Sequence, residues 1–477
     1  MLFNSIGFLI FLPIVFCLYW FVFNKKFQHQ NRLLLLASFY FYACWDWRFL
    51  FLLMFSIGLD YVSGIKIENS KNNREAKFWL TLSIVINLGF LGFFKYYNFF
   101  VESFADLLSS FGFTVNVWLI NIILPVGISF YTFHGLSYVI DVYKKRIKAE
   151  RNFTDYAVFV SYFPLLVAGP IERATHLLPQ IQRKRVFNYE QAVDGMRQIL
   201  WGFFKKMVIA DNCAPLVNEI FNNYQTETPV NLAIGAVLFA FQIYGDFSGY
   251  SDIALGVSRL FGIELLKNFS FPYFSRDIAE FWRRWHISLS SWFRDYLYIP
   301  LGGSKGGLPM KIRNTFIIFL VSGFWHGANW TFIIWGGLNA LYFMPLLIMN
   351  KNRQNLEVAA QGRLLPSVKE IFQILITFSV TCIAWIFFRA ESVSQAYHYI
   401  LRICSVELYS VPHNLPVKVF GLIGFMMIVE WINREQFHGL EIKRYMPWVR
   451  RIFYLAVIYI ILRYANFGNN EFIYFQF

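Results

Sequence analysis

Charged residues are scarce in this sequence. Asp, Glu, Lys and Arg make up 15% of the 477 residues, whereas 57% are hydrophobic. Soluble globular proteins carry about 25% charged residues, so the composition excludes an ordinary soluble domain. Apolar runs of nearly 20 residues recur along the chain, which predicts an all-α polytopic membrane protein. The ten-residue alternation typical of a membrane β-barrel is missing.

Cysteine is also rare, and its spacing argues against a disulfide framework or a metal site. The five cysteines form no CxxC pair, and most lie in apolar runs, so we expect them to pack. The sequence contains no HExxH pair and no GxSxG pattern of the hydrolase type, so we expect no bound metal and no serine nucleophile of that type. Short clusters of basic residues alternate with apolar runs, which sets orientation in a membrane and does not indicate nucleic acid binding.

The apolar segments predict about eleven membrane spans plus re-entrant helices. We expect helices at about 2–23, 32–45, 48–63, 78–100, 117–142, 193–220, 229–245, 249–262, 315–328, 330–349, 371–389, 415–433 and 452–466. The charge pattern places the N-terminus outside and the basic clusters in the cytoplasm. Prolines and glycines interrupt residues 152–192, which favours a re-entrant or interfacial segment there.

A single integral-membrane domain is expected over residues 1–477. Its peripheral helices would occupy about 1–115, its core about 117–350 and its C-terminal helices about 371–477. The loop at about 350–370 is polar, and we expect it to be the most dispensable stretch.

One histidine, His326, lies in a stretch from Asn314 to Met349 that contains no Asp, Glu, Lys or Arg. An imidazole in hydrocarbon needs a partner or a task. Burial favours its neutral, basic form, so the residue suggests proton transfer inside the membrane. The alternative is a histidine that hydrogen-bonds two helices together.

Two further polar clusters lie among aromatic residues. Arg283 and Arg284 precede His286, and guanidinium groups suit a phosphate or carboxylate, although lipid head groups would also occupy them. His286 is either catalytic or a satisfied interfacial histidine. Asp246 and Asp252 form the second cluster, and we expect them to orient a histidine or to pair with an arginine.

These clusters are compatible with acyl transfer from a thioester. Such an electrophile needs little activation, so the protein must exclude water, align a hydroxyl with the thioester carbonyl and remove one proton. One neutral histidine can remove that proton. A coenzyme A or phosphopantetheine arm that enters from the cytoplasm would meet the arginines first.

Several long motifs, in order, resemble the membrane-bound O-acyltransferase family. The match is closest to the bacterial branch typified by the membrane subunit of alginate O-acetylation, and the teichoic-acid D-alanyl transfer protein is a more distant relative. The motifs are LPVGISFYTFHGLSYVIDVY (124–143), FPLLVAGPIER (163–173), GFFKKMVIAD (202–211), YGDFSGYSDIALG (244–256), FWRRWHISLSSWFRDYLYIPLGGS (281–304), FWHGANWTFIIWG (324–336), WIFFRAES (385–392) and FIYFQF (472–477).

The resemblance implies a ring of helices around a thin floor pierced by a tunnel. It implies that His326, in the WHG motif, is the essential catalytic residue and that His286 lies on the donor side. We expect donor contacts from Arg283, Arg284, Trp285, Trp325 and Asn329. We expect structural or orienting roles for Asp246, Asp252, Arg294 and Asp295.

The expected protein is therefore an O-acyltransferase of the bacterial inner membrane. It would move an acyl group, most simply acetyl, from acetyl-CoA or an acyl-carrier thioester to an extracytoplasmic hydroxyl of an exopolysaccharide or envelope polymer. No cofactor would stay bound, and an extracytoplasmic acetyltransferase or an acyl carrier protein would be the partner. The alternatives are a D-alanyl or other acyl transferase, a non-catalytic scaffold, and a transporter of lipid-linked sugars.

Overall fold

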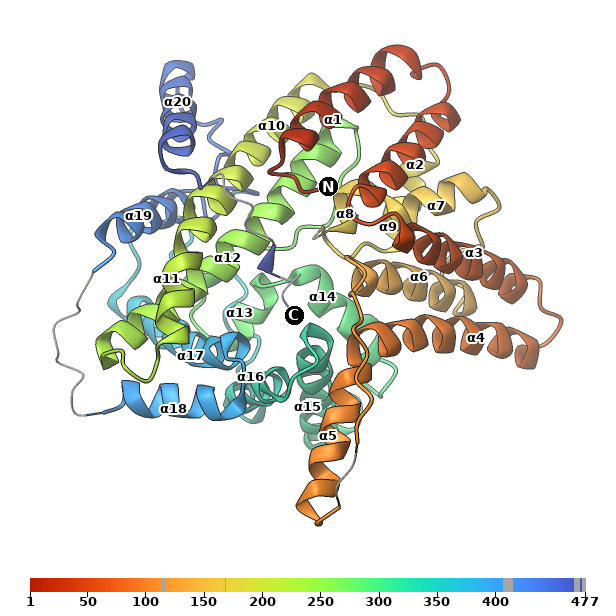
Figure 1. The fold of residues 1–477 in the computed structure, drawn as a ribbon. Helices are drawn as coiled ribbons and strands as arrows, with labels where there is room; N and C mark the ends of the chain where they lie inside the picture. Colours follow the sequence, from red (N-terminus) through yellow and green to blue (C-terminus); the bar gives the residue numbers. More distant parts are fainter. Residues whose placement is uncertain (114–115, 168, 406–414, 467–471, 474–477) are drawn as a thin grey trace. The chain divides into compact units, whose positions relative to one another are not determined.

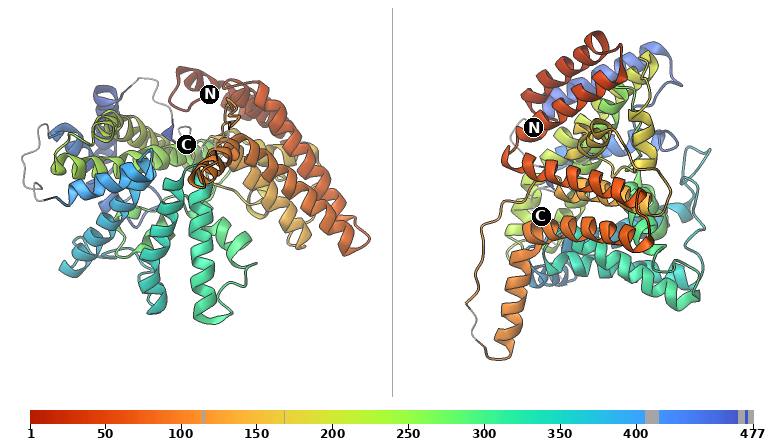
Figure 2. Two further views of the ribbon diagram at one scale, coloured as in Figure 1. Left: turned by 60° about the horizontal axis from the view of Figure 1, so that its bottom comes forward. Right: turned by 90° about the vertical axis from the view of Figure 1, so that its right-hand side faces the viewer.

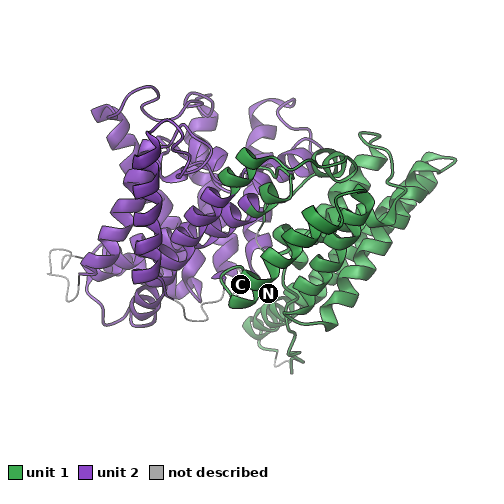
Figure 3. Cartoon of the chain, turned by 90° about the horizontal axis from the view of Figure 1, so that it is seen from above, with its two compact units in different colours: residues 1–195, 257–266 green, residues 196–256, 267–477 purple. Residues whose placement is uncertain are grey.

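The computed structural model in Figure 1 describes residues 1–113, 116–167, 169–405, 415–466 and 472–473. Every regular element in those ranges is helical, as the apolar segments predict. The chain forms two compact units, coloured separately in Figure 3: residues 1–195 with 257–266, and residues 196–256 with 267–477. Residues 474–477 of the last predicted motif lie outside the described residues.

The first unit is built from the helices of the N-terminal region. They are α1 (Ile6–Cys17) with the π-helical turn η1 (Leu18–Val22), α2 (Phe27–Ala43), α3 (Arg48–Glu68), α4 (Asn73–Leu91), η2 (Gly92–Tyr96), α5 (Tyr97–Ser110), α6 (Ile128–Tyr143), α7 (Phe153–Ser161), α8 (Phe163–Leu166), α9 (Ala174–Ile181) and the first part of α10 (Tyr189–Phe203). The short helices α7, α8 and α9 fill the region that the prolines interrupt.

Small and polar residues allow α3 to pack closely on its neighbours. A side chain on Gly135 of α6 would collide with the Asp60 carboxylate of α3, so only glycine fits there. Asp60 is fully buried and accepts hydrogen bonds from Ser83 (2.6 Å) and Asn87 (2.8 Å) of α4. Such polar contacts link membrane helices where lipid offers no hydrogen-bond partner.

The second unit contains the remaining helices. They are η3 (Phe204–Ala210), α11 (Asp211–Asn222), most of α12 (Pro229–Leu260), η4 (Pro272–Phe274), α13 (Ile278–Arg284), α14 (Ile287–Phe293), η5 (Arg294–Tyr298), α15 (Gly307–His326), α16 (Trp330–Ile348), α17 (Val368–Arg389), α18 (Val393–Ile403), α19 (Val417–Ile432) and α20 (Pro447–Tyr464). Of these, η3 and η5 are π-helical.

Among the described residues, five helical segments are long and apolar enough to cross a membrane. They are Arg48–Glu68, Asn73–Ser110, Pro229–Leu260, Trp330–Ile348 and Val368–Arg389. The predicted break near residue 246 is wrong, because α12 continues through Asp246, whose charge a lysine neutralises. The predicted helix at 117–142 begins only at Ile128, after Pro125 and a left-handed Gly127 (φ 74°).

A helical hairpin of α15 and α16 creates the corner that the sequence predicts near Gly327. The two views of Figure 2 show these helices side by side. A Cβ atom on Gly323 would lie 2.2 Å from the Phe332 carbonyl oxygen, and one on Gly336 would lie 2.3 Å from that of Phe319. Glycine at both positions therefore lets the backbones approach closely, which places the last residue of α15 inside the unit.

Candidate active site

His326 is the last residue of α15, and aromatic rings surround it. Its side chain is 3% exposed. The imidazole makes edge-to-face contacts with Trp325 (4.9 Å between centroids), Trp335 of α16 (5.1 Å) and Phe388 of α17 (5.2 Å). These three rings are apolar, and apolar surroundings favour the neutral form of an imidazole.

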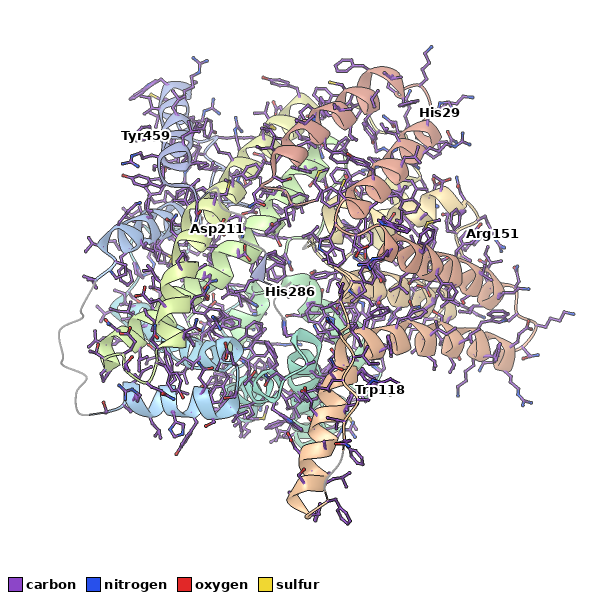
Figure 4. The ribbon with its side chains drawn as sticks, viewed as in Figure 1. His29, Trp118, Arg151, Asp211, His286 and Tyr459 are labelled. Carbon is purple, nitrogen blue, oxygen red and sulfur yellow. The ribbon has the colours of Figure 1, made fainter. Side chains whose placement is uncertain are left out.

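His286 lies at the corner between α13 and α14, and Figure 4 labels it. Its backbone is left-handed (φ 44°, ψ 54°), an unusual conformation that turns the chain sharply. The ring is 1% exposed, packs edge-to-face on Phe247 at 4.6 Å, and lies 6.5 Å from the His326 ring between centroids. The structure thus brings together the two histidines that the sequence singled out.

Asn268 holds the His286 ring through its Nδ1 atom. No motif in the sequence pointed to this asparagine. The His286 Nδ1 atom lies 2.9 Å from the Asn268 Oδ1 atom. The Ser288 hydroxyl donates to the same oxygen at 2.9 Å, and the Asn268 Nδ2 donates to the Ser251 hydroxyl at 3.1 Å. Burial lowers the pKa of the His286 imidazole to about 3, so this ring is neutral at physiological pH.

The two predicted donor-binding arginines hold a loop in this structure. Arg283 donates to the carbonyl oxygens of Asn352 (2.8 Å) and Asn355 (2.7 Å), and Arg284 donates to that of Glu357 (3.0 Å). The loop that we expected to be dispensable is therefore fixed by guanidinium groups. A phosphate at this place would compete with its backbone carbonyls.

The predicted orienting carboxylates pair with lysines of the π-helical turn η3 rather than with arginines. Asp246 contacts Lys206 Nζ at 2.6 Å and accepts a hydrogen bond from the Ile473 amide at 2.6 Å. Asp252 contacts Lys205 Nζ at 2.5 Å. Both lysines are buried, so these pairs join η3 to α12 inside the second unit.

Three other predicted site residues have structural contacts. Asn329 caps the N-terminus of α16 by accepting the Thr331 amide (3.0 Å), and it donates to the Glu391 carbonyl oxygen (2.9 Å). Arg294 and Asp295 pair with each other at 2.8 Å, and the Arg294 side chain is 63% exposed. Among the described residues, no group of three His, Cys, Asp or Glu side chains has an arrangement suited to a metal ion.

Trp285, which we also expected at the donor site, belongs to the aromatic wall. It is 1% exposed, and its ring lies 5.5 Å from Phe281 and 5.0 Å from Trp385 between centroids. Trp385 in turn stacks on Trp335 at 5.6 Å, and Trp335 contacts the His326 ring. A continuous layer of rings therefore connects the surroundings of the two histidines.

Two buried histidines in aromatic walls, one of them held neutral, are an arrangement suited to acyl transfer inside a membrane protein. The family model described as MBOAT, membrane-bound O-acyltransferase family, matches residues 136–388, which include both histidines and Asn268. The chain belongs to this family and is an O-acyltransferase.

Three named proteins are similar to between 57% and 94% of the chain. The probable alginate O-acetylase AlgI of Pseudomonas aeruginosa is 41% identical over 454 residues, which are 94% of this chain and 84% of that protein. The peptidoglycan O-acetyltransferase of Helicobacter pylori is 36% identical over 425 residues, covering 83% of this chain and 78% of that protein. The teichoic acid D-alanyltransferase of Bacillus subtilis is 28% identical over 288 residues, covering 57% and 70%.

Proposed function

We propose that this chain acts as one integral domain of the bacterial inner membrane and transfers an acetyl group from a cytoplasmic thioester to an extracytoplasmic hydroxyl. The pair of buried histidines, 6.5 Å apart between ring centroids, is the observation that carries the proposal. The names of the relatives support an acetyl donor and a polysaccharide or peptidoglycan acceptor. The immediate acceptor would be the polymer or an extracytoplasmic acetyltransferase that relays the group to it.

In this mechanism His326 is the general base. The acceptor oxygen attacks the thioester carbonyl carbon while His326 takes the hydroxyl proton. The carbon–sulfur bond then breaks, and the proton passes to the sulfur of the leaving thiol. His286 positions or polarises the thioester, or assists the protonation of the thiol, and Trp325 helps to keep the pocket dry.

The arginines and the polar corner residues would serve the donor. Arg283 and Arg284 would release their loop contacts, or share them with a phosphate-bearing donor such as acetyl-CoA or an acyl carrier protein. Asn329 would hold the corner that follows His326. Asp246 and Asp252 would keep α12 in place behind the site.

A second candidate reaction is D-alanyl transfer from a carrier protein. The similarity to the teichoic acid D-alanyltransferase favours it, although that match covers 57% of this chain. Both reactions use a thioester and a hydroxyl, so the same two histidines would serve either. The donor supplied in the assay distinguishes them.

The proposal is tested by label transfer from acetyl-CoA in membranes that contain the chain, with the envelope fraction as acceptor. Wild type is compared with His326→Ala and with His398→Ala, a matched control in which an exposed histidine of α18 is removed. We expect transfer by wild type and the control, and none by His326→Ala at equal protein abundance. Equal transfer by all three would contradict a base at His326. Transfer only from a D-alanyl carrier thioester would select the second reaction.

A further inference from the structure

The orientation of the Asn268 amide can be read from its neighbours. The backbone N–H of Ser288 lies 3.4 Å from the Asn268 Oδ1 position, and a backbone N–H can only donate. The amide atom that faces Ser288 must therefore be oxygen. The same oxygen faces His286 Nδ1 at 2.9 Å, so that nitrogen must carry the proton of the neutral ring.

This arrangement leaves the other ring nitrogen with its lone pair. In the part of the chain that the structure describes, His286 Nε2 has no hydrogen-bond partner, although it is buried. An unpartnered acceptor beside the His326 ring is open to a group that arrives from outside. A neutral imidazole in this form cannot donate from Nε2, so it can only accept a hydrogen bond or a proton there.

We propose that Asn268 is a positioning residue that fixes His286 as an acceptor at Nε2, for an N–H or O–H group of the bound substrates. The inference rests on the proposed acyl transfer and narrows the role of His286. It excludes direct donation from the neutral His286 ring to the thioester carbonyl. Two serines fix the orientation of the Asn268 amide: its Nδ2 donates to the Ser251 hydroxyl, and its Oδ1 accepts from the Ser288 hydroxyl.

Two substitutions separate positioning from simple packing. Asn268→Ala removes the acceptor for Nδ1–H, and we expect kcat/KM to fall about 10- to 100-fold, as when the group that orients a histidine is lost elsewhere. Asn268→Asp keeps an acceptor and adds a negative charge, so it retains activity at alkaline pH.

The pH profile is the readout that a packing role would not move. A carboxylate beside the ring raises the pKa of His286, so activity of Asn268→Asp is lost as the pH falls through that raised pKa. Wild type has no such loss near neutral pH, because burial lowers the pKa of His286 to about 3. Among the residues that the structure describes, the titratable ring in contact with His286 is that of His326, which is unchanged in every variant.

The matched control is Asn223→Ala, which removes an exposed asparagine after α11. All proteins are compared at equal abundance in reconstituted membranes. If Asn268→Ala has the rate and pH profile of wild type, this inference is wrong, and the proposed acyl transfer still stands. The same holds if Asn268→Asp is as inactive as Asn268→Ala at every pH. Wild type without transfer from any thioester would overturn the proposed function and this inference together.

A separate groove in the first unit carries a second, independent inference. It has a volume of about 450 Å³, within the usual range of ligand sites, and its aromatic lining includes Phe16, Trp20, Phe21 and Phe187. Lys184 lies at its rim. The buried Arg185 is already occupied by the Ile181 carbonyl oxygen (2.8 Å) and other interior groups.

Exposed basic residues adjoin two lining residues of this groove, Asn24 and Lys184, in the sequence. Lys25, Lys26, Arg183 and Lys184 are exposed, and among the described residues none of them forms an ion pair. They follow apolar helices at the side that the charge pattern assigns to the cytoplasm, where bacterial membranes present anionic head groups. An apolar wall beside a basic rim matches a molecule with acyl chains and a phosphate.

We infer that this groove binds an anionic phospholipid, with its phosphate at Lys184 and its chains along the aromatic rings. The test measures the lipid retained by the purified chain from vesicles that contain equal amounts of phosphatidylglycerol and phosphatidylcholine. We expect a preference for phosphatidylglycerol that falls about 5-fold for each lysine removed in Lys25→Gln and Lys184→Gln.

The control replaces two exposed lysines elsewhere in the unit, Lys71→Gln before α4 and Lys77→Gln within it. Retention of the preference in this control supports the groove. Equal loss in the control pair, or no preference in wild type, would overturn the inference. A Phe187→Ser substitution that lowers retention of both lipids equally would locate the acyl chains.

Discussion

Two buried histidines, one in each unit, differ in how their nitrogens are used. His134 of α6 and His286 are each 1% exposed. The Nε2 atom of His134 accepts the backbone N–H of Glu172 at 3.0 Å, so its lone pair is occupied by the protein. In His286 the proton-bearing nitrogen binds Asn268, and Nε2 has no partner among the described residues.

The comparison teaches that burial alone does not mark a functional histidine. The two rings differ in whether the protein itself supplies a hydrogen-bond donor to the unprotonated Nε2 atom. His134 joins α6 to the segment before α9, and its imidazole acts as a structural acceptor. His286 occupies a left-handed corner, where its helix neighbours supply no donor for Nε2.

The largest effect is expected at His326. His326→Ala removes the proposed base, and we expect the transfer rate per folded molecule to fall about 10²- to 10⁴-fold. Single-turnover transfer by purified, reconstituted protein measures this rate. A fall of less than about threefold would remove His326 from the chemistry.

The second effect contrasts His286 with His134. His286→Ala should lower the rate per folded molecule about 10- to 100-fold, in addition to the stability that is lost with a buried ring. His134→Ala leaves the Glu172 N–H unsatisfied, which costs about 1–3 kcal/mol of stability but leaves the rate per folded molecule unchanged. Thermal unfolding in detergent, measured beside the transfer rate, separates the two outcomes. The comparison fails if His134→Ala lowers the rate at equal folded protein.

The third effect concerns a buried ion pair that performs no proposed chemistry. Asp246→Ala leaves Lys206 with one carboxylate partner, Asp211 at 2.8 Å, and leaves the Ile473 amide without its acceptor, so we expect a loss of about 1–3 kcal/mol of stability. Lys206→Met should cost about 3–5 kcal/mol, because it leaves both carboxylates buried without their common cation. Denaturation of the purified variants measures both, and a Lys206→Met variant more stable than Asp246→Ala would contradict this explanation.

The smallest effect is expected at the pair of Arg294 and Asp295, in which the arginine side chain is 63% exposed. Surface ion pairs contribute about 0–1 kcal/mol, so Asp295→Asn should change neither stability nor the transfer rate measurably. The same two assays apply. A loss of activity at equal stability would show that η5 has a role in the reaction that its exposed contacts do not reveal.

The sequence was a good guide wherever composition controls the structure. The helical class followed from apolar runs, and the corner after His326 followed from Gly327 in a stretch without charges. The predicted break at 246 failed because a carboxylate inside α12 is neutralised by Lys206, which lies forty residues earlier. The helix α18 (Val393–Ile403) was not predicted because its one apolar face is too short to form a run.

The site was only partly predictable, because several of its contacts are formed between residues far apart in the sequence. His286 and His326 stand out by residue type, but Asn268 is one amide in an aromatic stretch, and its partners Ser251 and Ser288 are set by tertiary contacts. The arginine contacts with the loop at 350–370 involve backbone carbonyl oxygens, which every residue has. No pattern of side chains could have indicated them.

The most direct test of this account is transfer by wild type, His326→Ala and His134→Ala, measured together in reconstituted membranes and normalised to folded protein. The account predicts a rate close to wild type for His134→Ala and a loss of at least about 100-fold for His326→Ala. Equal rates for all three proteins would contradict it, because the buried histidine proposed as the base would then be no more important than the structural one.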